Sequence, residues 1–179
     1  MWVFGYGSLM WRPGFDYEAV HPALMQGVHR QPCVYSHVHR GTRERPGIVL
    51  GLDRGGACRG LAFQIQEDRW DETLDYLRGR ELVTNVYLEA KRHARLDDGR
   101  RVLCTTYIVD TAHEQYAGRL SHDALLQQVR GAVGQSGPNE AYVIETANKL
   151  KAMGVRDRRL EALAADLRLA TMKNASDPK

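Results

Sequence analysis

The stretch Val3-Phe4-Gly5-Tyr6-Gly7-Ser8-Leu9 decides how the chain is interpreted, because it joins a strand pattern directly to a glycine turn. The apolar residues 2–4 predict a buried strand, and Gly5 and Gly7 let the backbone turn sharply and approach a ligand closely. Successive N–H groups leaving such a turn can converge on an anion or a carbonyl oxygen. The stretch therefore favours a cradle for a small molecule, with an ordinary β-turn as the alternative.

The composition is that of a soluble globular protein. The chain has 179 residues, of which 43% are hydrophobic and 26% are charged. This length suits one domain with a sizeable core, so we expect a single domain over residues 1–179 with a frayed tail from about residue 171. The net charge of +3 is too small to indicate a nucleic-acid partner. No apolar run is long enough to span a bilayer and no signal-peptide pattern is present, so we expect a cytoplasmic protein with no membrane partner.

The cysteines indicate neither a disulfide framework nor a zinc site. There are three of them, Cys33, Cys58 and Cys104, and no CxxC pair. Each lies among strand-forming residues, which favours a small buried hydrophobe in a reducing compartment. A catalytic thiol is the minor alternative.

The first two-thirds of the chain predicts strands. The predicted strands span residues 2–5, 24–36, 47–52, 59–66, 86–96 and 102–109. Asp98-Gly99 predicts a hairpin turn between the last two. One helix interrupts the strands, with Asp68 as its cap and Trp70, Leu74 and Leu77 on its inner face.

The last third predicts helices. Their expected caps are Ser121, Asn139 and Asp157. The apolar positions of the first are Leu125, Val129 and Val133, those of the second are Val143, Ala147 and Leu150, and those of the third are Leu160, Leu163, Ala164 and Leu167. Because strands and helices do not alternate, we expect an α+β fold whose mixed or antiparallel sheet closes into a small β-barrel with helices packed outside.

Glu81 is a candidate acid–base residue. It lies between the predicted helix and the next strand, followed by Leu82 and Val83. Apolar surroundings disfavour the charged carboxylate and raise its pKa, which suits general acid–base catalysis near neutral pH. The alternative is a salt bridge from Glu81 to Arg78 or Arg80 at a helix end.

The basic segment 37–47 permits several interpretations. Phosphate binding is disfavoured because no aromatic residues interleave with the charges. A metal site would start from His37 and His39, but no further ligands are spaced nearby. Arg40 and Arg43 can grip a substrate carboxylate, and a solvated surface loop is the remaining alternative. Elsewhere the chain lacks a G-x-S-x-G elbow, a P-loop and a dinucleotide fingerprint.

Five segments in order resemble the glutathione-specific branch of the ChaC-like γ-glutamylcyclotransferase family. They are residues 2–11 (WVFGYGSLMW), 36–42 (SHVHRGT), 45–52 (RPGIVLGL), 80–81 (RE) and 137–157, which runs from GPNEAYV to GVRD. The resemblance implies a small mixed β-barrel with helices outside. It also implies cleavage of glutathione into 5-oxoproline and cysteinylglycine, with no metal and no organic cofactor.

The resemblance also implies roles for individual residues. Glu81 would be the catalytic acid–base, Tyr87 would face the substrate, and Arg40 would contact it. The γ-glutamyl group would be held by Val3, Phe4, Gly5, Tyr6, Gly7, Ser8 and Leu9. The chain departs from many members at Thr84-Asn85-Val86, where they have a glycine-rich step. The alternatives are a cyclotransferase for other γ-glutamyl peptides or amines and a non-catalytic module that binds a γ-glutamyl ligand; the oligomeric state stays open.

Overall fold

The computed structural model describes residues 1–175, with side chains to residue 169. The chain divides into two compact units. The first comprises residues 1–31 and 50–116, and the second comprises residues 32–49 and the chain from 117 onward. The expected single domain over the whole chain stays a prediction.

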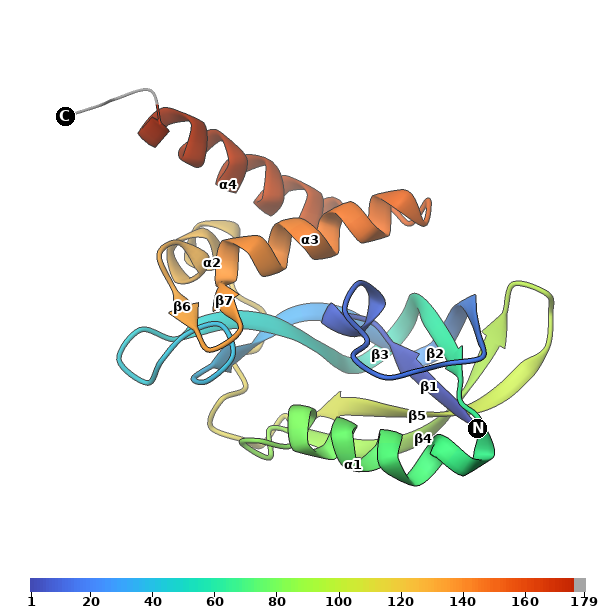
Figure 1. Ribbon diagram of the computed structural model, residues 1–179. Helices are drawn as coiled ribbons and strands as arrows, with labels where there is room; N and C mark the ends of the chain where they lie inside the picture. The colour runs from blue at the N-terminus through green and yellow to red at the C-terminus, as the bar shows by residue number, and fades with distance from the viewer. Residues whose placement is uncertain (176–179) are drawn as a thin grey trace. The chain divides into compact units, whose positions relative to one another are not determined.

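A closed barrel of five strands dominates the first unit (Figure 1). The strands are β1 (Trp2–Gly5), β2 (Ala19–Ser36), β3 (Gly47–Gln64), β4 (Tyr87–Leu96) and β5 (Arg101–Val109). Their order around the barrel is β1-β3-β2-β4-β5. Strand β1 pairs antiparallel with β3 and parallel with β5, so the sheet is mixed. The predicted α+β fold with a mixed β-barrel is confirmed.

The predicted hairpin is also confirmed, and it sets the register of the barrel. Strands β4 and β5 pair from Tyr87 opposite Val109 to Arg95 opposite Arg101. On the other side of β5, Val3 is in register with Thr105. Directly opposed residues point to the same face of a sheet, so this register decides which side chains share a face.

Strand β3 corrects the prediction of two separate strands over residues 47–52 and 59–66. It is one strand from Gly47 to Gln64, and Gly55 and Gly56 adopt φ values of 88° and 73° within it. Glycine tolerates this left-handed conformation, so the strand continues through the pair where a turn was predicted. Strand β2 likewise begins at Ala19, before the predicted start at residue 24.

Helix α1 (Trp70–Glu81) follows a single 3₁₀ turn, η2 (Glu67–Arg69). The prediction that Asp68 caps α1 is wrong, because Asp68 lies inside that turn and Arg69 occupies the cap position without a side-chain bond. Thr73 and Leu77 are the buried residues of α1. The helix lies along the β4–β5 hairpin (Figure 1), where Arg78 donates two hydrogen bonds to Glu89 of β4 at 2.8 and 3.0 Å.

The second unit contains α2 (His122–Val129), α3 (Asn139–Ala152) and α4 (Arg158–Ala175) (Figure 1). Two predicted caps are confirmed. The Ser121 hydroxyl accepts the N–H of Ala124 at 3.2 Å, and the Asp157 carboxylate accepts the N–H of Leu160 at 3.1 Å. Helix α4 continues past residue 171, where fraying was predicted; residues 176–179 of that tail lie outside the described residues.

Two expectations for the second unit are wrong. Asn139 does not cap α3, because its buried amide accepts the N–H of Ile48 at 2.7 Å and donates to the carbonyl of Ile48 at 2.9 Å. Val133 does not extend the inner face of α2. That helix ends at Val129, and Val133 is 54% exposed in the short strand β6 (Val133–Gly134), which pairs with β7 (Gly137–Pro138).

Candidate functional site

The turn after β1 begins at Gly5 and leads into the 3₁₀ turn η1 (Ser8–Met10). Val3 and Phe4 are fully buried, so this part of the strand supports the turn from within the core. A side chain at Gly5 is excluded, since a Cβ there would lie 2.9 Å from the Cβ of Leu9. Leu9 is itself buried, and Ser8 is half-buried. Among the side chains of the turn, the Ser8 hydroxyl is therefore the polar group best placed to meet a small molecule.

Arg30 of β2 fixes the first half of this turn. Its Nε donates to the carbonyl of Tyr6 at 2.6 Å, and its Nη2 lies 3.8 Å from the sulfur of Met10. Because a guanidinium presents several donors in one rigid plane, it can hold separate parts of a loop at once. Arg30 thus orients the peptide that links Tyr6 to Gly7.

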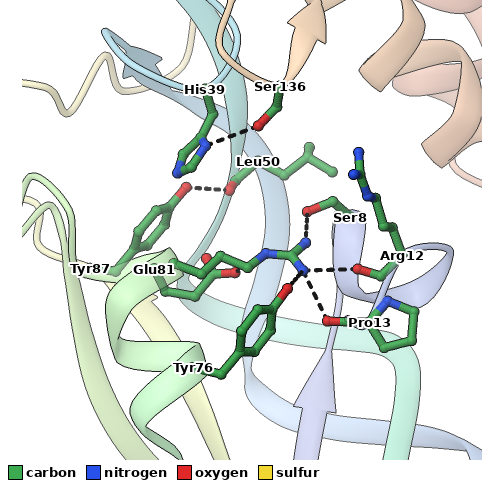
Figure 2. Close-up of polar contacts among 10 residues, drawn as sticks. Ser8, Arg12, Pro13, His39, Leu50, Tyr76, Glu81, Tyr87 and Ser136 are labelled. Atoms are coloured by element: carbon green, nitrogen blue, oxygen red, sulfur yellow. Dashed lines mark hydrogen bonds and ion pairs between the residues drawn. The ribbon is translucent and has the colours of Figure 1, made fainter. Parts of the chain in front are cut away.

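Arg80 of α1 fixes the second half (Figure 2). Its Nη2 donates to the Ser8 hydroxyl at 2.8 Å. Its Nη1 donates to the carbonyls of Arg12 and Pro13, both at 2.9 Å, and to the Tyr76 hydroxyl at 3.0 Å. One side chain therefore connects the glycine turn to the last turn of α1.

Glu81 ends α1 beside this guanidinium. Its Oε1 lies 3.3 Å from Nε of Arg80, and both side chains are only 17% exposed. Burial raises the pKa of Glu81 above its usual value, and the positive charge of Arg80 opposes that effect only in part. Glu81 thus has both the predicted raised pKa and the ion pair with Arg80 that was its alternative. Arg78, the other expected partner, pairs with Glu89 instead.

Tyr87 is the first residue of β4, and its hydroxyl donates to the carbonyl of Leu50 in β3 at 2.7 Å (Figure 2). The segment before it, residues 84–86, stands where the resemblance would place a glycine-rich step. Asn85 adopts a φ of 58° there, a left-handed conformation that asparagine tolerates better than most residues. The chain thus makes a glycine-like backbone turn without glycine, and the contact of Tyr87 with substrate stays a prediction.

Arg40 belongs to the second unit. Its Nη1 donates to the carbonyl of Pro138 at 3.1 Å, and its guanidinium lies 5.4 Å from the centre of the Tyr142 ring. In the same unit, Nδ1 of His39 lies 3.1 Å from the Ser136 hydroxyl (Figure 2). The predicted contact of Arg40 with substrate stays a prediction.

Within the first unit, the structure brings Glu81 and the turn of residues 5–9 together through Arg80. Arg80 was expected only as a possible salt-bridge partner and as part of the Arg80-Glu81 segment of the resemblance, and Arg30 was not expected at the site. The sequence signal for Arg80 was its position next to Glu81. Arg30 gave no signal, because it is 24 positions from Tyr6, the residue that it contacts. Across the described residues, no cluster of three His, Cys, Asp or Glu side chains could hold a metal ion, and no helix there is both long and apolar enough to cross a membrane.

The chemistry available at this site is proton transfer by Glu81, beside the turn of residues 5–9 that Arg80 holds in place. A recessed carboxyl with a raised pKa can accept a proton and return it near neutral pH. The fixed guanidinium and the Ser8 hydroxyl add polar groups at its edge. The site therefore suits a small polar substrate that must lose one proton and gain another during reaction.

Comparison with known proteins identifies the family of the chain. The family model described as ChaC-like protein matches residues 1–170. The chain is 31% identical over 177 residues to the glutathione-specific gamma-glutamylcyclotransferase of Escherichia coli (strain K12), covering 99% of this chain and 77% of that protein. It is 30% identical over 169 residues to glutathione-specific gamma-glutamylcyclotransferase 1 of Homo sapiens, covering 91% of this chain and 76% of the other.

A crystal structure of the yeast gamma-glutamyl cyclotransferase specific to glutathione matches the fold. Its TM-score is 0.85 at 23% identity, and the match covers 94% of this chain and 95% of the yeast chain. At this identity the match supports the fold, while the sequence comparisons carry the relationship. The chain belongs to the ChaC-like protein family.

Proposed function

We propose that this protein cleaves glutathione into 5-oxoproline and cysteinylglycine. The observation that carries the proposal is the recessed Glu81 carboxyl, whose pKa is raised and which Arg80 links to the Ser8 hydroxyl of the glycine turn. Relatives from Escherichia coli and Homo sapiens that carry the name glutathione-specific gamma-glutamylcyclotransferase align with nearly the whole chain. Both observations favour the same reaction.

The reaction is an intramolecular aminolysis. The α-amine of the γ-glutamyl group attacks the group's own side-chain carbonyl, a ring C–N bond forms, and the bond to the cysteine nitrogen breaks. Since nucleophile and electrophile belong to one molecule, correct alignment can contribute up to roughly 7–11 kcal/mol of barrier lowering. Because the substrate supplies the nucleophile, the reaction as proposed requires no metal and no organic cofactor.

Glu81 serves both halves of this reaction. As a carboxylate it takes a proton from the substrate ammonium, which must become a neutral amine before it attacks. As a carboxylic acid it then returns that proton to the departing nitrogen, which otherwise leaves poorly. The ring nitrogen gives up its second proton to the amine of cysteinylglycine, so the products are the neutral lactam and an ammonium group. A positioned acid–base of this kind typically contributes about 10²–10⁴-fold to the rate.

The glycine turn holds the γ-glutamyl group. Backbone N–H groups in residues 6–9 stabilise the negative charge that develops on the attacked carbonyl oxygen, an effect worth roughly 3–4 kcal/mol per good donor. Val3, Phe4, Gly5 and Leu9 contribute by shaping the backbone, since Val3, Phe4 and Leu9 are buried. Arg40 and Tyr87 complete the proposed set of substrate contacts.

The proposed location is the cytoplasm, and the cysteines support it. Cys33, Cys58 and Cys104 are all buried, and none of the three forms a disulfide in the structure. Free thiols persist in reducing compartments, where glutathione is the abundant thiol that such an enzyme would consume.

The direct test is to incubate the purified protein with glutathione and identify the products by mass spectrometry. We expect equimolar 5-oxoproline and cysteinylglycine, and Glu81→Gln should lower their rate of release by at least about 10²-fold. Glu72→Gln is the matched control, because Glu72 lies on the same helix with a side chain 74% exposed, and it should keep the wild-type rate. Release of 5-oxoproline by Glu81→Gln at the wild-type rate would exclude Glu81 as the base.

Two further substrates separate the alternatives. Faster release of 5-oxoproline from γ-glutamyl-alanine than from glutathione would indicate a cyclotransferase for other γ-glutamyl peptides. Binding of glutathione by titration calorimetry without any product would indicate a binding module.

A further inference from the structure

The hydroxyl of Tyr107 is buried and has no hydrogen-bond partner. Among the described side chains, it is the one buried oxygen or nitrogen of which this is true. Tyr107 lies in the middle of β5 and is 1% exposed. Buried tyrosine hydroxyls ordinarily find a partner, and leaving one unpaired costs free energy. An unpaired buried hydroxyl points to a hydrogen bond that forms only during function.

The register of the barrel places Tyr107 beside the strand residue that binds α1. Tyr107 is directly opposite Glu89 of β4, so the two side chains share one face of the hairpin. Glu89 forms the two-bond ion pair with Arg78 of α1, and Arg78 lies one helical turn before Glu81. Glu89 and Arg78 thus connect the strand pair that holds Tyr107 to the turn of α1 that ends in the candidate catalytic carboxylate.

Burial, together with two neighbouring carboxylates, keeps the phenol of Tyr107 protonated. Burial raises the pKa of Tyr107 most, the carboxylates of Glu89 and Glu81 raise it further, and Arg78 opposes them. At neutral pH the side chain is therefore a hydrogen-bond donor and not a base. Of the two neighbouring carboxylates, Glu89 is already held by Arg78, whereas Glu81 has one oxygen beside Arg80 and can accept further bonds.

We propose that Tyr107 is a positioning residue for the proposed reaction, whose buried hydroxyl donates to the Glu81 carboxylate once the γ-glutamyl group is bound and aims that carboxylate at the substrate amine. The inference rests on the proposed function, because it assigns Tyr107 a task only if Glu81 is the base. A hydrogen bond to the charged form stabilises the carboxylate and lowers the pKa of Glu81 in the complex, which opposes the effect of burial.

The test is Tyr107→Phe, which removes the hydroxyl and keeps the ring. With glutathione as substrate we expect kcat to fall about ten- to a hundredfold with little change in KM. The acidic limb of the kcat profile should move up by about one pH unit, because Glu81 loses a donor to its charged form. The melting temperature should stay the same or rise, because the variant loses an unpaired buried hydroxyl.

Tyr17→Phe is the control for loss of a phenol, because Tyr17 is 45% exposed and should keep the wild-type profile. An unchanged kcat and pH limb in Tyr107→Phe, or a rise in KM alone, would overturn the proposal, as would a lowered melting temperature with normal activity. If the wild-type protein releases no 5-oxoproline from glutathione, the proposed function itself fails and the assignment of Tyr107 falls with it.

Discussion

Arg80 contacts more parts of the candidate site than any of the predicted site residues does. Its guanidinium contacts the Ser8 hydroxyl, the carbonyls of Arg12 and Pro13, and the carboxylate of Glu81. Its charge also limits how far burial raises the pKa of Glu81. Arg80 therefore controls both the position of the turn and the protonation of the proposed base.

Replacing Arg80 tests this double role. We expect Arg80→Leu to lower kcat/KM for glutathione by at least about tenfold, because loop and carboxylate lose their shared donor. Without the cation the pKa of Glu81 rises further, so the acidic limb of the kcat/KM profile moves to higher pH. Arg80→Lys keeps the charge but not the planar set of donors, and should fall between wild type and Arg80→Leu.

Arg69→Leu is the matched control for Arg80→Leu. Arg69 precedes the same helix, is 46% exposed and pairs with Asp16 and Glu72, so its loss should leave the pH profile unchanged. A profile of Arg80→Leu that overlays the wild type would show that Arg80 does not influence Glu81.

At this scale the sequence indicated, for a physical reason, a carboxylate that the structure shows to be recessed and to have a raised pKa. Glu81 ends a helix among apolar neighbours, and that local pattern is visible without coordinates. Arg30 and Tyr107 gave no such signal, because their importance depends on contacts with Tyr6 and Glu89, which only strand pairing brings close.

At the scale of the element, Asn139 shows how a terminus can serve tertiary structure. It stands where a helix cap was predicted, yet its amide pairs with both the N–H and the carbonyl of Ile48. Two backbone hydrogen bonds in a buried place outweigh one capping bond. The local sequence shows that Asn139 could cap a helix. It does not show that Ile48, 91 residues away, competes for the same amide.

We expect Asn139→Ala to destabilise the protein by about 2–4 kcal/mol, because it leaves a buried N–H and a buried carbonyl of Ile48 without their partner. The free energy of unfolding in urea is the measurement. Asn148→Ala, at an exposed position of the same helix, should change it by no more than about 0.5 kcal/mol. Equal effects of the two substitutions would show that the two hydrogen bonds between Asn139 and Ile48 do not stabilise the protein.

Strand β3 gives a second lesson at this scale. The sequence Asp53-Arg54-Gly55-Gly56 has the composition of a turn, and it splits the strand in the prediction. In the structure the same glycines lie inside one strand, which continues beyond them to Gln64 opposite Trp2. Local composition cannot separate a turn from a strand that continues through two glycines, because glycine adopts the left-handed region in both.

At the scale of the whole molecule, the order of strands and helices predicted a mixed or antiparallel sheet closed into a barrel, and the family resemblance implied a mixed one. The pairing of β1 with β3 and β5 confirms the mixed barrel. The clear hairpin and the two confirmed helix caps are local features, so the sequence alone predicted them. The start of β2, the cap of α3 and the continuity of β3 depend on distant partners, and these are the elements that the prediction missed.

Chelation tests the proposed chemistry of the molecule as a whole. If the substrate supplies its own nucleophile, treatment with EDTA should leave the rate of 5-oxoproline release unchanged. Comparison of the rates before and after chelation, with the metal content measured in both samples, is the experiment. A lost rate that returns on adding back a divalent cation would require a different mechanism.

A crystal structure of the Glu81→Gln protein with glutathione tests the central claim most directly. We predict that the γ-glutamyl amine lies within hydrogen-bond distance of the side chain at position 81, and that the carbonyl to be attacked faces the backbone N–H groups of residues 6–9. Glutathione bound away from the Ser8 turn, or with its amine remote from position 81, would contradict the account.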